Sequence, residues 1–288
     1  MNKLNTPLQS AYKANHSTQT ALVKIFNDVL TEIDHGNVVL LTLLDLSAAF
    51  DTVDHNILLK RLDHSFRISA KCLKWFESYL TGRSQHVMIK GSKSKDVQLS
   101  CCVPQGSVLG PDLYSKYTSP LSSLISSLSL SYHFYADDSQ IWTSVNPNSV
   151  TNQIQAVSIL EQGVKEIGEW MFKNKLQLNK EKTELLVIGT KKQRQKMQLS
   201  SIQLDGDVID AVPEARNLGV IIDSSLSIEA HVNNVCKLCY IQLRNITKIR
   251  CYLTTEATKR LVQALVMSRL DYCNVVLFRI SNKFLSKL

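Results

Sequence analysis

The sequence predicts a mixed α/β fold, and three local patterns lead to this expectation. Residues 38–44 carry apolar side chains on both alternating faces, which is typical of a strand covered on both sides. Residues 132–142 place two β-prone runs around Asp137 and Asp138, and so predict a tight hairpin with two carboxylates at its tip. Residues 154–171 space apolar side chains by three and four, which predicts a long helix with one buried face.

The remaining elements follow from the same rules in chain order. Residues 8–35 are predicted to be helical, with Ser17 as the candidate cap and Gly36 just after the end. The Asp-Gly pair at 205–206 predicts a hairpin turn. The other expected elements are helices at 47–65, 70–82, 110 onward, 227–250 and 255–270, a hairpin within 83–99, and a strand at 184–189.

Composition describes a globular chain with a mild basic excess. The 288 residues are 44% hydrophobic and 20% charged, enough for one large domain, alone or with a small appendage. The net charge of +8 permits a polyanionic partner without requiring one. The N-terminus has no apolar signal core, and no apolar run approaches the roughly 20 residues that span a bilayer. We therefore expect an intracellular protein, nuclear or cytoplasmic, without membrane contact or secretion.

Acidic side chains at strand ends suggest a metal site. Asp45 ends the apolar strand, and if that strand lies beside the hairpin, Asp45 and Asp137 converge with Asp138 adjacent. Mg²⁺ binds such a few carboxylates and keeps its other positions for phosphate and water. A turn in open water would also tolerate two neighbouring aspartates, so a solvated turn is the alternative.

Three motifs then resemble those of a reverse transcriptase in order and spacing. They are residues 44–51 (LDLSAAFD), 103–111 (VPQGSVLGP) and 135–138 (YADD). More narrowly, they resemble the enzymes of non-LTR (LINE-type) retrotransposons in the jockey-like group. The resemblance runs from about residue 10 to about residue 274.

This resemblance implies the right-hand polymerase fold, with an antiparallel palm sheet backed by helices, partial fingers and a helical thumb. Residues 1–37 would be a partial fingers helix and 38–225 the palm, with a fingers insertion at about 66–102. Residues 226–288 would be a truncated helical thumb. The fingers hairpin that precedes the first helix in the family has no counterpart here, so truncation at both ends is expected.

The family's catalytic residues carry over to four side chains. Asp45, Asp137 and Asp138 would hold two Mg²⁺ ions, with Mn²⁺ as a substitute, and the backbone carbonyl of Leu46 would join them. Lys182 would lie near the triphosphate and stabilise or protonate the leaving pyrophosphate. An ordinary exposed lysine is the alternative for Lys182.

Its binding residues carry over in the same way. Phe50 would stack under the sugar and exclude a 2′-hydroxyl, although a core phenylalanine fits the composition equally well. Gln105 and Gly106 would contact the template base and the incoming nucleotide. Leu218 and Gly219 would form the primer grip, a hairpin that holds the primer end.

The activity implied is RNA-directed DNA synthesis by a two-metal mechanism. Its partners would be an RNA template, a DNA primer and deoxynucleoside triphosphates. One alternative is a catalytically inactive remnant that still binds nucleic acid. The other is an unrelated α/β protein whose aspartate pair is only a turn.

Overall fold

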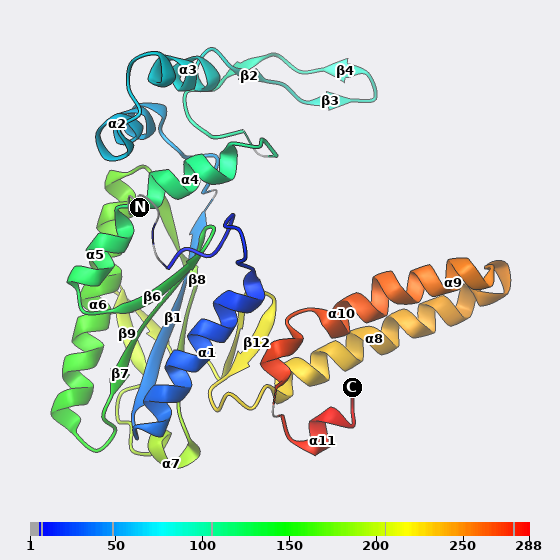
Figure 1. Cartoon of the computed structure of the whole chain (residues 1–288). Coiled ribbons are helices and arrows are strands. Elements are labelled where there is room, and N and C mark those ends of the chain that lie inside the picture. The colour runs from blue at the N-terminus through cyan, green and yellow to red at the C-terminus, as the bar shows by residue number, and fades with distance from the viewer. Residues whose placement is uncertain (1–5, 7, 48, 105, 205, 279) are drawn as a thin grey trace.

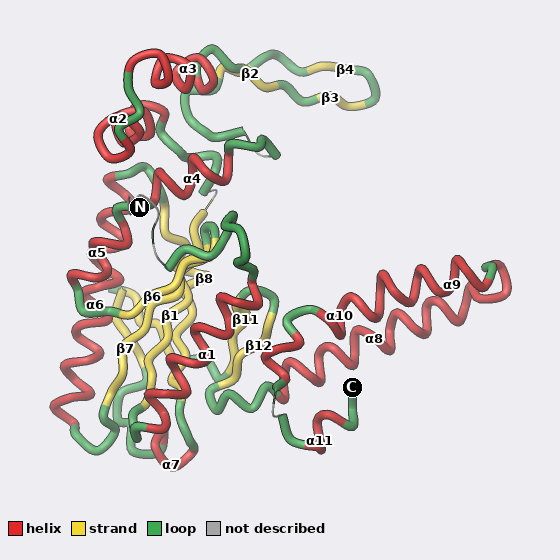
Figure 2. Tube along the Cα trace, viewed as in Figure 1, coloured by secondary structure: helices red, strands yellow, loops and turns green. Residues whose placement is uncertain are grey.

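A computed structural model describes residues 6, 8–47, 49–104, 106–204, 206–278 and 280–288. Its centre is a four-stranded antiparallel sheet with the order β6-β7-β1-β8 (Figure 1). These strands are β1 (Val38–Ser47), β6 (Ser131–Tyr135), β7 (Asp138–Val145) and β8 (Gln177–Ile188). Helices surround this sheet, as the colouring by secondary structure makes plain (Figure 2). The mixed α/β fold with an antiparallel sheet is thereby confirmed.

Strand β1 is central because it is apolar on both faces. Its side chains alternate between two hydrophobic clusters, as the period of two along a strand requires. Val38, Leu40 and Leu44 enter the cluster that includes helix α6 (Val150–Lys173), and Val39, Leu41 and Leu43 enter the one that includes helix α1 (Thr18–Asp34). Truncating a fully buried leucine such as Leu40 to alanine would cost about 2–5 kcal/mol of stability.

Other predicted elements lie close to their expected places. They are helices α3 (Ala70–Leu80), α4 (Gly110–Thr118) and α5 (Leu121–Ser127), and strand pairs β2 (Ser84–Gln85) with β5 (Val97–Gln98), β3 (Met88–Ile89) with β4 (Ser92–Lys93), β9 (Ser201–Leu204) with β10 (Asp207–Asp210), and β11 (Glu214–Asn217) with β12 (Val220–Asp223). Short helical segments complete the chain: α7 (Lys191–Arg194), η1 (Arg250–Tyr252), the π-helical η2 (Gln263–Met267), α10 (Ser268–Asp271), η3 (Asn274–Leu277) and α11 (Asn282–Leu285).

The first predicted helix starts later than expected. Ser17 caps α1 through a capping box with Thr20, and the helix begins at Thr18 rather than near residue 8. Residues 8–10 instead lie alongside β6, where the backbone N–H of Ser10 donates to the carbonyl of Phe134. Tertiary hydrogen bonds therefore override the local helical pattern in this segment.

The second helix is also shorter than predicted. Helix α2 (His55–Phe66) begins after Asp54, whose side chain accepts from the N–H of Ile57 at 3.0 Å. The described residues just before Asp54 form turns, and the carbonyls of Phe50 and Val53 accept hydrogen bonds from residues 103 and 102. Pairing with that distant loop competes with helix formation. Strand β8 is longer than predicted, because pairing with β1 extends it back to Gln177.

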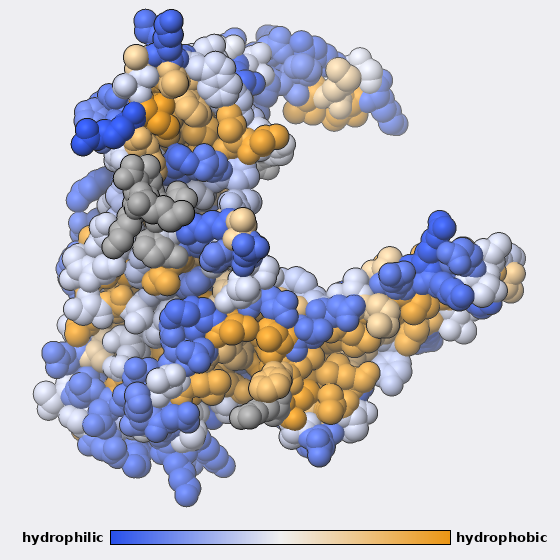
Figure 3. Space-filling model, viewed as in Figure 1, coloured by the Kyte–Doolittle hydropathy of each residue, from blue (hydrophilic) through white to orange (hydrophobic). Residues whose placement is uncertain are grey.

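Two arms project from the same side of the sheet body. One comprises α3 and the paired strands β2–β5, and the other comprises the long helix α8 (Glu229–Ile249) packed against α9 (Thr255–Val262). The space-filling view shows an open hollow between the two arms (Figure 3). No helix among the described residues is both long enough and apolar enough to cross a membrane.

Candidate active site

Strand register brings two of the three predicted aspartates to one place. Strand β1 pairs with β7 so that Leu44 lies opposite Ser139, which puts Asp45 beside Asp138. Asp138 is the first residue of β7 and Asp137 lies in the preceding turn. Asp45 and Asp138 both line a pocket of about 330 Å³. The other lining residues are Leu43, Leu44, Ser139, Gln140, Glu181, Lys182, Glu184, Arg216, Asn217 and Leu218.

Negative charge accumulates at this edge of the sheet. Although Asp138 is accessible to solvent, partial burial and then repulsion from Asp137 and Asp45 raise the pKa of its carboxyl to about 6. Across the pocket the ammonium of Lys182 lies 3.2 Å from Oδ2 of Asp45. That oxygen is buried, and among the described residues its contact with Lys182 is an ion pair rather than a hydrogen bond. A divalent cation in place of the ammonium would balance the charge of the same oxygen and reduce the repulsion among the carboxylates.

These residues suit a divalent metal in their chemistry. The carboxylates of Asp45 and Asp138 line one pocket and repel each other, and both are hard oxygen ligands of the kind that Mg²⁺ binds. Within the described part of the chain, no three His, Cys, Asp or Glu side chains are grouped so that they could hold an ion. The ion pair with Lys182 occupies Asp45, so metal binding requires a shift of that flexible lysine.

Phe50 is half-buried and packs against the larger of the two hydrophobic clusters of the sheet. Its half-buried ring stacks on Tyr114 with centroids 4.7 Å apart and an interplanar angle of 24°. Burial raises the pKa of the Tyr114 hydroxyl, and the charges of Asp137 and Asp138 add to that shift. Tyr114 is thus a buried residue that stacks on Phe50 and lies within electrostatic range of the two aspartates.

The predicted loop against the nucleotide is only partly visible. Gln105 lies outside the described residues. Gly106 has φ +77 and is exposed, and a β-carbon added there would meet no atom of the described residues within 4 Å. The hydroxyl of Ser107 donates to the carbonyl of Pro104 and accepts from the N–H of Gly110, which fixes the base of this loop. Gly106 does not line the pocket of the aspartates.

The predicted primer-grip residues form the turn between β11 and β12. Leu218 and Gly219 both have positive φ, and Leu218 lines the pocket. The hydroxyl of Tyr272 donates to the carbonyl of Leu218 at 2.8 Å. Beneath the turn, the buried amide of Gln140 donates to Asn217 at 3.0 Å, which ties the hairpin to β7.

The structure brings several residues to the pocket that the motifs do not include. Gln140 follows Asp138 by two and therefore shares its face of β7. Glu184 also lines the pocket, but the pairing of β8 with β1 shifts register between Asn179 and Glu184, so counting by two from Lys182 does not identify it. Burial raises the pKa of Glu184. Counting by two could have found Gln140, whereas Arg216 carries no such signal. Leu46 is buried and paired with Leu178, and the role of its carbonyl stays a prediction.

Comparisons with known proteins agree with the motif order. A family model described as reverse transcriptase (RNA-dependent DNA polymerase) matches residues 1–222. The chain is 26% identical over 263 residues to a probable RNA-directed DNA polymerase from transposon BS of Drosophila melanogaster, which covers 88% of this chain and 27% of that protein. It is 25% identical over 232 residues to the RNA-directed DNA polymerase from the mobile element jockey of the same species, covering 79% of this chain and 24% of the relative.

The chain thus spans about a quarter of the length of the curated relatives it matches. Among solved structures, telomerase from Candida Tropicalis in complex with a fragment of telomeric RNA matches with a TM-score of 0.48 at 13% identity. That match covers 95% of this chain and 44% of the telomerase chain. Since the family model matches most of the sequence, the chain belongs to the reverse transcriptase family of RNA-dependent DNA polymerases.

Proposed function

We propose that this chain carries the RNA-directed DNA polymerase activity of a non-LTR retrotransposon. One observation supports it most strongly: adjacent central strands present Asp45 and Asp138 in one pocket, with Lys182 of β8 3.2 Å from Asp45. The substrates would be an RNA template, a DNA primer and deoxynucleoside triphosphates. All of these occur inside the cell, in the nucleus or the cytoplasm, and the activity would take place there.

The proposed subdomains follow the right-hand arrangement of polymerases. Residues 38–225 would form the palm, residues 1–37 and the insertion at about 66–102 the fingers, and residues 226–288 the thumb. The two projecting arms are then the insertion and the thumb, and the hollow between them is where a primer–template duplex would lie (Figure 3). Exposed basic side chains on α8, such as Arg244 and Lys248, suit contact with a phosphate backbone.

In the reaction, the primer 3′-oxygen bonds to the α-phosphorus of the nucleotide, and the bond to the bridging oxygen of the β-phosphate breaks. The 3′-hydroxyl loses its proton, and pyrophosphate departs with the negative charge. Lys182 would protonate that leaving group or stabilise its charge from the strand beside Asp45.

Reverse transcriptases generally use divalent metal ions. Asp45, Asp137 and Asp138 would hold them here, with the carbonyl of Leu46, and bound Mg²⁺ or Mn²⁺ supplies charge neutralisation at the reacting phosphate. The paired strands β1 and β7 hold the carboxylates of Asp45 and Asp138 in fixed positions. Phe50, supported by Tyr114, would exclude ribonucleotides, and Gln105 with Gly106 would contact the incoming nucleotide. Leu218 and Gly219 would hold the primer end.

Primer extension tests the proposal directly. The wild type, Asp45→Asn, Asp137→Asn and a control Glu169→Gln are given an RNA template, a labelled DNA primer, deoxynucleotides and Mg²⁺. Glu169 lies on α6, where it pairs with Lys173 at the protein surface, so its change removes one negative charge away from the pocket. Extension by the wild type and Glu169→Gln, lost in both aspartate variants, is the expected result.

A different outcome would identify the alternative function. If the wild type fails to extend the primer but binds primer–template in a salt-sensitive way, the chain is a nucleic-acid-binding remnant without polymerase activity. Extension that persists in Asp45→Asn and Asp137→Asn would remove these aspartates from the mechanism.

A further inference from the structure

The segment just before α1 forms an additional strand-like edge on the sheet. The backbone N–H of Ser10 donates to the carbonyl of Phe134 at 3.0 Å, and the N–H of Phe134 donates to the carbonyl of Leu8 at 2.8 Å. Gln9 thereby bridges Phe134 in parallel orientation. This contact joins residue 9 to a strand that ends only two residues before Asp137.

The side chain of Gln9 then reaches past β6 to the aspartate turn. Its Nε2 donates to the carbonyl of Ala136 at 3.2 Å, and its Oε1 accepts from the N–H of Ala136 at 3.1 Å. The same oxygen also accepts from the N–H of Ala11 at 2.9 Å. Gln9 is only 4% exposed, so these bonds are shielded from competing water. One planar amide therefore holds both polar backbone groups of a single turn residue.

Ala136 needs such support because of its backbone conformation. It has φ +57, in the left-handed region that a β-carbon disfavours by roughly 1–2 kcal/mol. Tyr135 pairs with Asp138, so Ala136 and Asp137 make up the two-residue turn. A change of conformation at Ala136 would re-aim the side chain of Asp137 directly.

We propose that Gln9 is a positioning residue for the catalytic aspartates. Its amide holds Ala136 in the left-handed conformation and thereby fixes where Asp137 and Asp138 stand relative to Asp45. Gln9 touches no reacting atom. The inference rests on the proposed polymerase function, in which misplacing a catalytic group by about 1 Å costs on the order of 100-fold in rate.

The test compares Gln9→Met with Ser10→Ala. Methionine keeps the length and most of the volume of glutamine but makes neither hydrogen bond to Ala136. Ser10 is a matched control: it is equally buried at 4%, lies in the same segment, and its hydroxyl bonds Nε2 of His133 at 2.9 Å rather than the turn. Both variants are measured well below their melting temperatures.

Three readouts are taken on each protein. The first is hydrogen exchange of the 135–139 amides, the second is kcat and the nucleotide KM for primer extension, and the third is the Mg²⁺ concentration for half-maximal rate. Gln9→Met is expected to exchange the Ala136 amide at least about 10-fold faster and to lose about 10–100-fold in kcat. Its nucleotide KM should stay within about twofold of the wild-type value, because the contacts that bind the nucleotide are unchanged. The Mg²⁺ concentration for half-maximal rate should rise, because the aspartates that would hold the ion are misplaced. Ser10→Ala should retain the wild-type values.

The proposal fails if Gln9→Met exchanges and turns over like the wild type. It also fails if both variants lose kcat in proportion to their lost thermal stability, since Gln9 would then be merely structural. If the wild type does not extend the primer, the proposed polymerase function fails, and hydrogen exchange alone tests the role of Gln9. Faster exchange of the Ala136 amide in Gln9→Met, but not in Ser10→Ala, supports the proposal that Gln9 fixes the turn. Unchanged exchange in Gln9→Met overturns it.

Discussion

At the scale of single residues, Phe50 has two competing roles, and its surroundings allow them to be separated. Its ring is half-buried and lies against Tyr114, which is itself fully buried. A core phenylalanine would contribute only to stability. A phenylalanine that excludes a 2′-hydroxyl would contribute to the choice of nucleotide.

Phe50→Val should therefore change selectivity as well as stability. Shortening the side chain opens space beneath the sugar, so the preference for deoxynucleotides over ribonucleotides in kcat/KM should fall by about 10–100-fold. Single-nucleotide incorporation with each nucleotide type measures this ratio. Phe172→Val is the control, because Phe172 is 81% exposed on α6. An unchanged ratio in Phe50→Val would mean that Phe50 acts only as a core side chain.

His133 makes the protein sensitive to acid. It is 3% exposed, Nε2 bonds Ser10, and Nδ1 has no hydrogen-bond partner among the residues that the structure describes. Burial, with a smaller contribution from Lys24, lowers the pKa of His133 to about 4. The unfolded chain takes up this proton near pH 6.5 and the folded chain only near pH 4.

Folding stability should therefore fall as the pH drops from about 6.5 to about 4, and should not change from this cause above 6.5. His133→Gln should flatten that part of the profile, because glutamine does not titrate. Urea unfolding at several pH values between 4 and 8 measures the effect. His35→Gln, at an exposed histidine, should keep the wild-type slope; equal slopes in all three proteins would contradict the assignment.

At the scale of elements, the β11–β12 hairpin depends on close contact with the end of the chain. Gly219 has φ +82, and a β-carbon there would lie 2.9 Å from Cε1 of Tyr272. The hydroxyl of the same tyrosine bonds Leu218. The turn is therefore held both by its backbone conformation and by a ring packed against it.

Gly219→Ala should destabilise the protein more than Gly36→Ala does. Both glycines have positive φ, and each alanine should cost roughly 1–2 kcal/mol for that reason. Of the two, Gly219 adds the collision with Tyr272, since no atom of the described residues lies within 4 Å of a β-carbon at Gly36. Chemical denaturation gives both free energies of unfolding. Equal losses would mean that the Tyr272 ring moves aside without cost.

The central elements could be predicted from sequence, and the connecting segments could not. Strand β1 and the hairpin around Asp137 are recognisable because their side-chain patterns reflect local burial. The helix predicted for residues 8–17 does not form, because Gln9 and Ser10 are hydrogen-bonded to β6 and the turn after it, more than a hundred positions further along the chain. Asp45 and Asp138 were predictable from motifs, and Leu218 from the resemblance to a primer grip. Arg216 was not, because it lies outside the motifs and only tertiary folding brings it to the pocket.

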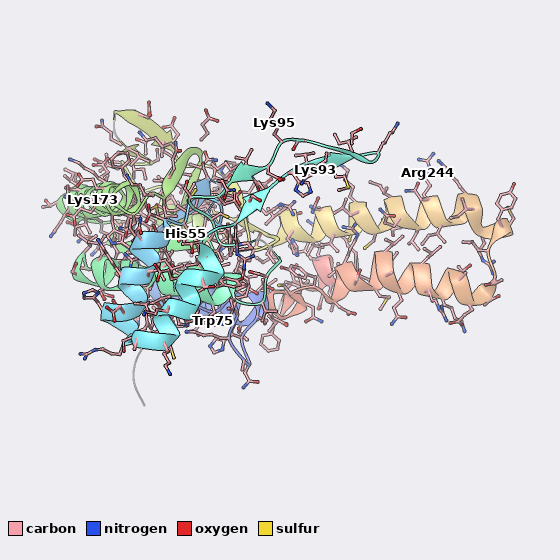
Figure 4. The ribbon with its side chains drawn as sticks, turned by 90° about the horizontal axis from the view of Figure 1, so that it is seen from above. His55, Trp75, Lys93, Lys95, Lys173 and Arg244 are labelled. Carbon is pink, nitrogen blue, oxygen red and sulfur yellow. The ribbon has the colours of Figure 1, made fainter. Side chains whose placement is uncertain are left out.

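At the scale of the whole molecule, the basic charge is placed where the arms project. Arg244 and Lys248 are exposed on α8, and Figure 4 shows Arg244 on the opposite side of the molecule from Lys173. The arm that contains α8 has its own small core of Val235, Cys239 and Val266, separate from the clusters around the sheet. Surface changes on the arm should therefore leave the sheet body intact.

The double change Arg244→Glu with Lys248→Glu should weaken primer–template binding. If both cations contact phosphates, the slope of log K against log salt should decrease in magnitude by about 2. Fluorescence anisotropy across a salt series measures this. Lys173→Glu makes the same charge change at one exposed lysine away from the arm, and it should leave the slope unchanged. A similar loss in all variants would indicate attraction by net charge alone.

The central position of β1 also has a consequence for the biosynthesis of this chain. Strand β1 leaves the ribosome early, but its neighbours β7 and β8 follow only after Asp138 and Gln177. At roughly 5–20 residues synthesised per second, the backbone edges of β1 stay unpaired for on the order of 10 s, until both partner strands have been made. During that interval the nascent chain exposes the uncharged, β-prone run of residues 38–44, which is a target for chaperones and for aggregation. Slow translation before residue 188 would lengthen that exposure.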